Sequence, residues 1–257
     1  MLPLPHSVAL GIIGVLSLCV ALEMLWSWRK HKRAYNTKET FANIAILLGF
    51  QISKVALFGY QLYWSNMAFS LALLPLPEAP WVFACCFVAT DCVYYWHHRI
   101  MHTTRFFWMF HVVHHSSPWM NLTTSYRLNW LSGIFGVFFY LPLIIIGFPP
   151  KFVAASVGLG LLYQFFLHTE AIGKLGVVEG ILNTPSAHRV HHATNKQYID
   201  KNYGGVFMLW DRVFGTYIEE EEKPQYGITS GFQGHNPFQL VFHGFADYVR
   251  GKMHYKG

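Results

Sequence analysis

Histidine is the residue of this chain whose number and spacing point most directly to chemistry. The chain of 257 residues contains 15 histidines. Eight of them form three short groups: His98 and His102; His111, His114 and His115; and His188, His191 and His192. Residues three or four positions apart project from one face of a helix, so each group presents two or three imidazoles in one direction. Because imidazole is a common ligand of transition metals, this spacing predicts a metal site.

The number of clustered histidines favours two metal ions over one. A first-row divalent ion accepts about four to six donor atoms, and eight imidazoles exceed that number. Successive residues of a helix point about 100° apart. His114 and His115, and likewise His191 and His192, can therefore serve different ions of one bridged dinuclear site. The ligand type alone does not separate iron from zinc, copper or nickel.

Polar residues near the groups are candidates for supporting roles. Asp91 and Tyr94 share a predicted helix face with His98 and His102. We expect Asp91 to orient a ligating imidazole through its second ring nitrogen, or otherwise to pair with another polar group where helices pack. His168 follows an apolar stretch and either completes the site or lies at the membrane edge.

The other histidines and the acidic run at residues 219–223 lack ligand spacing. His97 points about 100° away from His98, so we expect it beside the ligands and not among them. The acidic run is predicted to be a solvated loop. Five further histidines are expected at the surface: His6, His31, His235, His243 and His254.

The helices that position these histidines belong to a very apolar chain. Apolar residues make up 53% and charged residues 12% of it, against roughly 25% charged residues in an ordinary soluble domain. Because this number of charged residues is too small to cover a globule of this size, we expect much of the surface to face lipid. The composition also excludes disorder, and the four cysteines lie in apolar segments without a disulfide or metal motif.

The net charge of +6 fits an anionic membrane surface. A basic cluster at residues 29–33 directly follows an apolar stretch, as is typical of the cytoplasmic side of a membrane span. No nucleic-acid-binding motif is present in the sequence, so we expect membrane lipids and no nucleic acid as partners.

Five apolar stretches predict the membrane topology. They are residues 8–28, 41–74, 81–96, 131–148 and 151–168. The first is expected to be a retained anchor, and residues 41–74 could form one crossing or a hairpin of two. If the basic cluster at 29–33 lies in the cytoplasm and residues 41–74 cross once, the chain crosses five times. Residues 97–130 and 169–257 then also lie in the cytoplasm. The predicted fold is an all-α membrane bundle of four to five transmembrane helices, with a cytosolic histidine-rich helical cap that holds a dinuclear metal site.

Three stretches carry a resemblance to the superfamily of fatty acid hydroxylases and sterol desaturases, which are histidine-rich membrane di-iron oxygenases. They read DCVYYWHHRIMH at 91–102, FHVVHHSS at 110–117 and NTPSAHRVHHATNKQYIDKNYGGVFMLWDRVFGTY at 183–217. With LYQFFLHTE at 162–170, they are most similar to the alkylglycerol monooxygenase branch and its bacterial relatives. The resemblance implies a single domain over 1–257 with a catalytic core at about 85–230.

The resemblance also implies the residues of the site. The eight clustered histidines would bind two iron ions, with His168 as a ninth ligand, and Ala187 stands where relatives often carry another histidine. By resemblance, Asn195, Asp200 and Asp211 are further supporting candidates, although helix capping and turn formation explain several such residues equally well. They join Asp91 and Tyr94, and Glu170, which follows the fifth apolar stretch.

The implied activity is hydroxylation of a lipid C–H bond with O₂, in a fatty acyl, alkylglycerol or sterol-like substrate. No amino-acid side chain oxidises an alkyl C–H bond, so the metal must supply this chemistry. The spans and the cap use nearly the whole chain, so we expect a separate electron donor: a ferredoxin, a cytochrome or a tetrahydropterin. The protein would lie in the cell membrane of a bacterium or the endoplasmic reticulum of a eukaryote. The alternatives are a lipid desaturase, a histidine-rich metal transporter and a zinc hydrolase.

Overall fold

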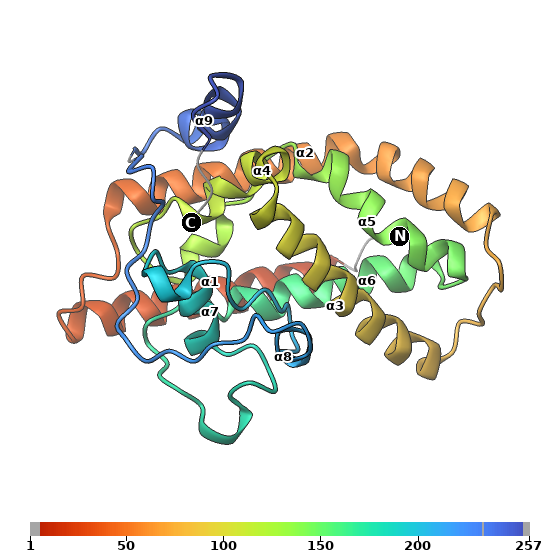
Figure 1. The fold of residues 1–257 in the computed structure, drawn as a ribbon, viewed down its shortest axis with the longest axis horizontal. Coiled ribbons are helices and arrows are strands. Elements are labelled where there is room, and N and C mark those ends of the chain that lie inside the picture. The colour runs from red at the N-terminus through yellow and green to blue at the C-terminus, as the bar shows by residue number, and fades with distance from the viewer. Residues whose placement is uncertain (1–5, 233, 254–257) are drawn as a thin grey trace.

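The computed structural model describes residues 6–232 and 234–253, and the regular elements in these ranges are helices (Figure 1). This confirms the predicted all-helical fold. The α-helices are α1 (His6–Arg29), α2 (Thr37–Ser70), α3 (Pro80–Thr103), α4 (Arg105–His115), α5 (Ser132–Ile146), α6 (Pro150–Phe165), α7 (Pro185–His192), α8 (Leu209–Val213) and α9 (Pro237–Val249). Three short 3₁₀ helices are η1 (Leu122–Tyr126), η2 (Gly176–Val178) and η3 (Lys196–Tyr198).

Two helices, α1 and α2, are long and apolar enough to cross a membrane. Helix α2 is a single helix of 34 residues, so the stretch that could have formed a hairpin is continuous. Helices α5 and α6 have 15 and 16 residues, which corresponds to about 22 to 24 Å of length. A hydrocarbon core is about 30 Å thick. The count of five crossings therefore stays a prediction.

The helices of the bundle place polar and apolar material at opposite ends. In Figure 1, α2 and α5 run toward the right, while α3 and α6 run back toward the left. The connections after α2 and α5 meet at the right-hand end, where Leu73 N donates to Ile145 O (2.8 Å) and Leu76 N donates to Gly147 O (3.0 Å). Gly147 has φ +135°, and a Cβ there would overlap the carbonyl of Leu74.

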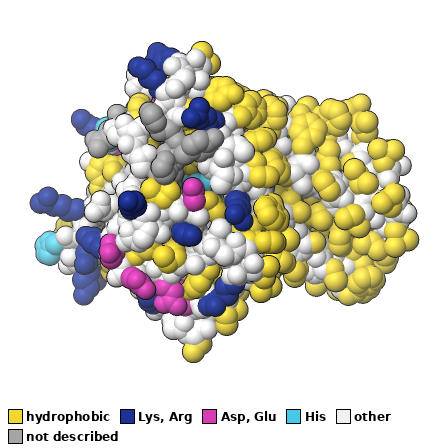
Figure 2. Space-filling model, in the orientation of Figure 1, with side chains coloured by type: hydrophobic (Ala, Val, Ile, Leu, Met, Phe, Trp, Pro, Cys, Tyr) yellow, Lys and Arg dark blue, Asp and Glu magenta, His cyan; other side chains and the backbone are white. Residues whose placement is uncertain are grey.

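The surface follows the same division. Figure 2 shows hydrophobic side chains over the right-hand end and the charged side chains gathered on the left. We call these the apolar end and the polar end. The apolar end is suited to lipid, whereas α4 and α7, which carry most of the clustered histidines, belong to the polar end.

A buried ion pair fixes α4 against α2. The guanidinium of Arg127 contacts the carboxylate of Glu39, and both side chains are at most 2% exposed. Arg127 also donates to Asn43 Oδ1 (2.6 Å) and to Ser116 Oγ (2.7 Å), while Ser117 Oγ donates to Glu39 Oε1 (2.8 Å). Because Ser116 and Ser117 directly follow α4, this network holds the end of α4 in place.

We expect Arg127→Met to lower the free energy of unfolding by about 3 to 5 kcal/mol, because it leaves the Glu39 carboxylate buried without its partner. Denaturant unfolding in detergent measures this change. Adding Glu39→Gln to Arg127→Met should restore part of the loss. A single variant as stable as the wild type would contradict a role for the pair in holding α4.

Candidate metal centre

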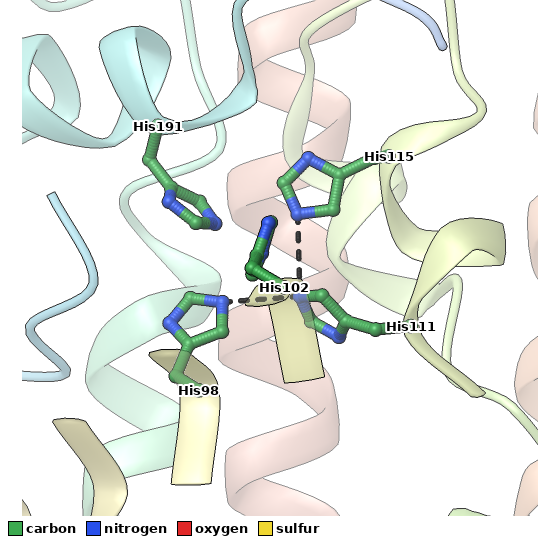
Figure 3. A group of neighbouring side chains, drawn as sticks. All are labelled: His98, His102, His111, His115 and His191. Carbon is green, nitrogen blue, oxygen red and sulfur yellow. Dashed lines mark hydrogen bonds between the residues drawn. The ribbon is translucent and has the colours of Figure 1, made fainter. Parts of the chain in front are cut away.

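The nine predicted histidines meet at the polar end in two groups. The first group is His98, His102, His111, His115 and His191, and the second is His114, His168, His188 and His192. Within each group, the possible ligand nitrogens lie within 4.8 Å of one another, and eight of the nine side chains are buried. Figure 3 shows the rings of the first group, which point toward a common centre from three segments of the chain. Each group could hold a metal ion.

Adjacent histidines in the sequence fall into different groups. The ring centroids of His114 and His115 are 5.3 Å apart with planes at 89°, and those of His191 and His192 are 5.4 Å apart, also at 89°. This is the division predicted from the helical turn. The groups touch where His115 stacks on His192 with 4.3 Å between the ring centroids.

Backbone carbonyls set the tautomers of three of the rings. Each contact joins a ring Nδ1 to a carbonyl oxygen: His98 to Tyr203 (2.9 Å), His191 to Lys201 (3.0 Å) and His168 to Gln164 (2.8 Å). A carbonyl oxygen only accepts, so Nδ1 carries the hydrogen, and in the neutral ring Nε2 is left as an acceptor. In these rings Nε2 therefore carries the lone pair that a metal ion would accept.

The spacing of the Nε2 atoms fits a metal ion. His168 Nε2 lies 3.2 Å from that of His114 and 3.0 Å from that of His188, whose Nε2 is 3.1 Å from that of His192. Nitrogens that bind one ion at about 2.1 Å and at right angles lie about 3.0 Å apart. Lone pairs this close repel one another unless a proton or a cation lies between them. A divalent ion would satisfy all four at once.

Burial keeps imidazoles of both groups uncharged. The pKa of His111 and the pKa of His192 are well below the usual histidine value, first because burial disfavours the charged ring and second because other imidazoles surround each of them. Neutral imidazole is the form that binds metal. His111 and His192 are therefore in the form that binds metal at neutral pH.

Helix α7 is short, and both its N-terminal residues and its contacts with other segments stabilise it. The Thr184 side chain accepts from Ala187 N (3.2 Å) as the N-cap, and Pro185 occupies the first turn. Arg189 of α7 forms a partly buried ion pair with Glu220 at 2.7 Å. The acidic run at 219–223 is therefore not only the solvated loop predicted from sequence, because one of its members holds α7.

The predicted contact between Asp91 and an imidazole needs correction. Asp91 accepts hydrogen bonds from Val206 N (2.8 Å), Phe207 N (3.1 Å) and Trp210 Nε1 (2.9 Å). It lies two helical turns before His98, about 10 Å along α3, and the loop before α8 and the start of α8 occupy its surroundings. Asp91 therefore pairs with other polar groups at a packing contact, which was the alternative interpretation.

Asp211 fixes the backbone of Tyr203 and Gly204, which lies next to the first group. Its carboxylate accepts from Tyr203 N and Gly204 N, both at 2.7 Å, and from the hydroxyl of Thr216 at 2.6 Å. This fixes the residue whose carbonyl accepts from His98. Asp211 thus supports His98 indirectly, through the backbone of Tyr203, and makes no hydrogen bond to the ring itself.

Other predicted residues lie at varying distances from the rings. Tyr94 has its ring centroid 5.3 Å from that of His98. Asp200 has φ +57° and precedes Lys201 in the chain. Glu170 accepts from the hydroxyl of Tyr226 (3.3 Å), and Asn195 is hydrogen bonded to the backbone of residues 223–225. Asn195 is a loop residue whose side chain holds this backbone, and its supporting role stays a prediction.

The histidines outside the groups are only partly as expected. His97 belongs to neither group. His243 is buried, not exposed, and donates to Leu240 O at 2.8 Å. His235 lies with Nδ1 3.1 Å from Glu39 Oε2. His31 is exposed as predicted, and the side chain of His6 and residue His254 lie outside the described part of the chain.

Sequence reasoning missed two neighbours of the rings. Gln164 supplies the carbonyl for His168 and is a polar residue one helical turn earlier in an apolar stretch, a spacing that could have indicated it. Trp108 is fully buried, with its ring centroid 5.1 Å from that of His102 and 5.5 Å from that of His115. Its proximity to the site depends on how α4 packs on α3, which the sequence does not show.

Comparison with known proteins places this site in a family. A family described as "Fatty acid hydroxylase" matches residues 83–216, which include all nine histidines. The alkylglycerol monooxygenase of Xenopus tropicalis is 38% identical over 87% of this chain and 50% of its own length. The human alkylglycerol monooxygenase is 42% identical over 74% of this chain and 42% of its own length. The ornithine lipid hydroxylase OlsE of Rhizobium tropici is 30% identical over 48% of this chain and 38% of its own length.

The predicted resemblance is thereby confirmed. The chain spans half or less of the length of these relatives. No solved structure matches it.

We expect the protein, purified in detergent and loaded with Fe(II) without oxygen, to hold two ions per chain. His168→Ala removes one of four nitrogens from the second group, so the iron content should fall toward one ion per chain. Elemental analysis by mass spectrometry measures this. His243→Ala is the matched control, because this histidine is buried but outside both groups, and it should retain two ions. Two ions in His168→Ala would contradict the assignment of the second group.

Proposed function

This chain belongs to the fatty acid hydroxylase family, and on that premise we propose that it is a membrane-bound non-haem di-iron oxygenase that hydroxylates a C–H bond of a lipid with O₂. The observation that carries the proposal is the convergence of nine histidines in two adjacent groups whose nitrogen spacing fits two divalent ions. The names of the relatives, alkylglycerol monooxygenase and ornithine lipid hydroxylase, support a lipid substrate.

Each group of histidines would hold one iron ion. Bound iron would supply the reduction of O₂ and the oxidation of the C–H bond, which no side chain can perform. The protein groups have other tasks. The carbonyls of Tyr203, Lys201 and Gln164 orient the rings of His98, His191 and His168. The buried ring of Trp108 lies beside His102 and would cover one side of the first group.

The division of the surface supports a site at the membrane boundary. The apolar end would lie in lipid, with up to five crossings, and the polar end on the cytoplasmic side with the basic cluster at 29–33. The membrane would be the cell membrane in a bacterium or the endoplasmic reticulum in a eukaryote. A metal transporter would instead place its ligands near the middle of the membrane, whereas these histidines lie at the polar end of α3.

A small pocket between α3, α5 and α6 supports an approach of the substrate from lipid. Its lining is part apolar and part polar: Phe87, Thr90, Asp91, Tyr94, Tyr140, Ser156, Val157, Gly160 and Gln164. The hydroxyl of Tyr94 donates to Gln164 Oε1 at 2.6 Å. The ring of Tyr94 lies beside His98 of the first group, and the carbonyl of Gln164 accepts from His168 of the second. This pair therefore joins the pocket to both groups. The pocket is small, about 10 Å³, so a hydrocarbon chain would reach the rings only if Tyr94 and Gln164 moved apart.

Electrons would come from a separate donor. A tetrahydropterin, a ferredoxin and a cytochrome are the candidates, and an artificial reductant can replace them in a test of activity. Hydroxylation is favoured over desaturation because the alkylglycerol monooxygenase relatives reach 38% and 42% identity, whereas a sterol desaturase of Aspergillus fumigatus reaches 28%.

We expect iron-loaded protein in lipid vesicles with ¹⁸O₂ and a reductant to incorporate one ¹⁸O atom into an alkylglycerol, or into another lipid of the vesicles. Lipid mass spectrometry measures the incorporation. His114→Ala and His191→Ala should each abolish it, because each removes a ligand of a different ion. Product formation under strict anaerobiosis, or a product whose new oxygen atom comes from water, would contradict the oxygenase proposal.

The pocket can be tested by filling it. Gly160→Leu should lower kcat/KM for a long-chain lipid by about tenfold or more, because its side chain would extend into the lining while the iron content stays at two. Gly158→Leu is the matched control on the same helix, since a Cβ there meets no atom within 4 Å. Equal kcat/KM for the two variants would contradict this route to the site.

A further inference from the structure

An acidic side chain inside α1 is buried although most of the helix is not. Glu23 is the one charged residue of the apolar stretch 8–28. It is 5% exposed, whereas the neighbouring Leu22 is 55% exposed and Leu25 is 40% exposed. A carboxylate is costly to bury among apolar groups unless hydrogen bonds satisfy it. The placement of Glu23 therefore needs an explanation beyond membrane anchoring.

Glu23 accepts hydrogen bonds from three different segments. Its Oε2 accepts from Leu122 N at 2.8 Å and from the hydroxyl of Tyr35, and its Oε1 accepts from the hydroxyl of Thr169. The Thr169 hydroxyl oxygen in turn accepts from Ala171 N at 3.0 Å. Its one hydrogen is thus directed at Glu23. The three partners all donate, which is the arrangement an ionised carboxylate requires.

Thr169 is the residue next to His168 of the second group. Helix α6 ends at Phe165, and His168 lies on the turn that follows, where its backbone N donates to Phe165 O at 3.4 Å. The carbonyl of Thr169 accepts from Arg189 Nη1 at 2.8 Å, and Arg189 adjoins His188 in α7. The segment is therefore fixed from two sides, by Arg189 through its backbone and by Glu23 through its side chain.

We propose that Glu23 is a positioning residue of the metal centre: through Thr169 it holds His168 in place for the second ion. This inference rests on the dinuclear site proposed above. It gives α1 a role in the site besides anchoring, because Glu23 links this otherwise exposed helix to a metal ligand. Groups that orient ligands commonly change metal affinity by 10 to 100-fold when they are removed.

The test uses Co(II) as the probe, titrated into metal-free protein in detergent and followed by its visible absorption. Thr169→Val removes the hydroxyl with little change in shape, and Glu23→Leu removes the carboxylate. Both should bind the second Co(II) at least about tenfold more weakly than the wild type, with the first ion unaffected. In the metal-free protein, both should speed hydrogen exchange in residues 168–172.

Two further variants are controls. Thr169→Ser keeps the hydroxyl and should restore the affinity for the second ion. Ser27→Ala removes the other buried polar contact of α1, in which Ser27 Oγ accepts from Ala34 N at 3.0 Å one turn after Glu23. Because Ser27 does not contact Thr169, this variant should bind two ions as the wild type does.

The outcomes separate this inference from the proposed function. If the wild type binds fewer than two ions, the dinuclear proposal fails, and the positioning role falls with it. If the wild type binds two ions and Glu23→Leu and Thr169→Val bind the second one equally well, only the positioning role is overturned. Equal weakening of both ions, or the same loss in Ser27→Ala, would show a general effect on folding and would also overturn it.

Discussion

The structure depends on bringing nine imidazole lone pairs together in a buried space. Neutral imidazoles add no negative charge, and three of the rings are oriented by carbonyl oxygens, which fix the tautomer without a charge of their own. The carboxylates of Asp91 and Asp211 hold the adjoining loop and do not contact the rings in their hydrogen bonds. Two divalent ions there would keep most of their positive charge, which favours anionic ligands derived from oxygen or solvent.

The segments that carry the histidines are tied to the bundle by buried or partly buried acids. Glu39 holds the end of α4 through Arg127, Glu220 holds α7 through Arg189, and Glu23 holds the segment after α6 through Thr169. None of these acids belongs to either group of histidines. Although the chain has few charged residues, these three acids lie where they fix the histidine-bearing segments at the polar end.

The sequence was sufficient where the information is local. Helical spacing alone predicts that His114 and His115 point in different directions, and they lie in different groups, because the turn per residue does not depend on the rest of the fold. It failed where tertiary contacts decide. The partners of Asp91 come from a loop more than 100 residues later, and the burial of His243 follows from the packing of α9. Apolar length alone predicts longer helices than α5, which ends before Gly147, and α6, which ends at Phe165 inside the apolar stretch.

The most direct measurement is anomalous X-ray diffraction at the iron edge from crystals of the iron-loaded protein. The account predicts two peaks per chain, one about 2.1 Å from imidazole nitrogens of the first group and one at the same distance from those of the second. A single peak shared by both groups, or iron bound away from these histidines, would contradict it.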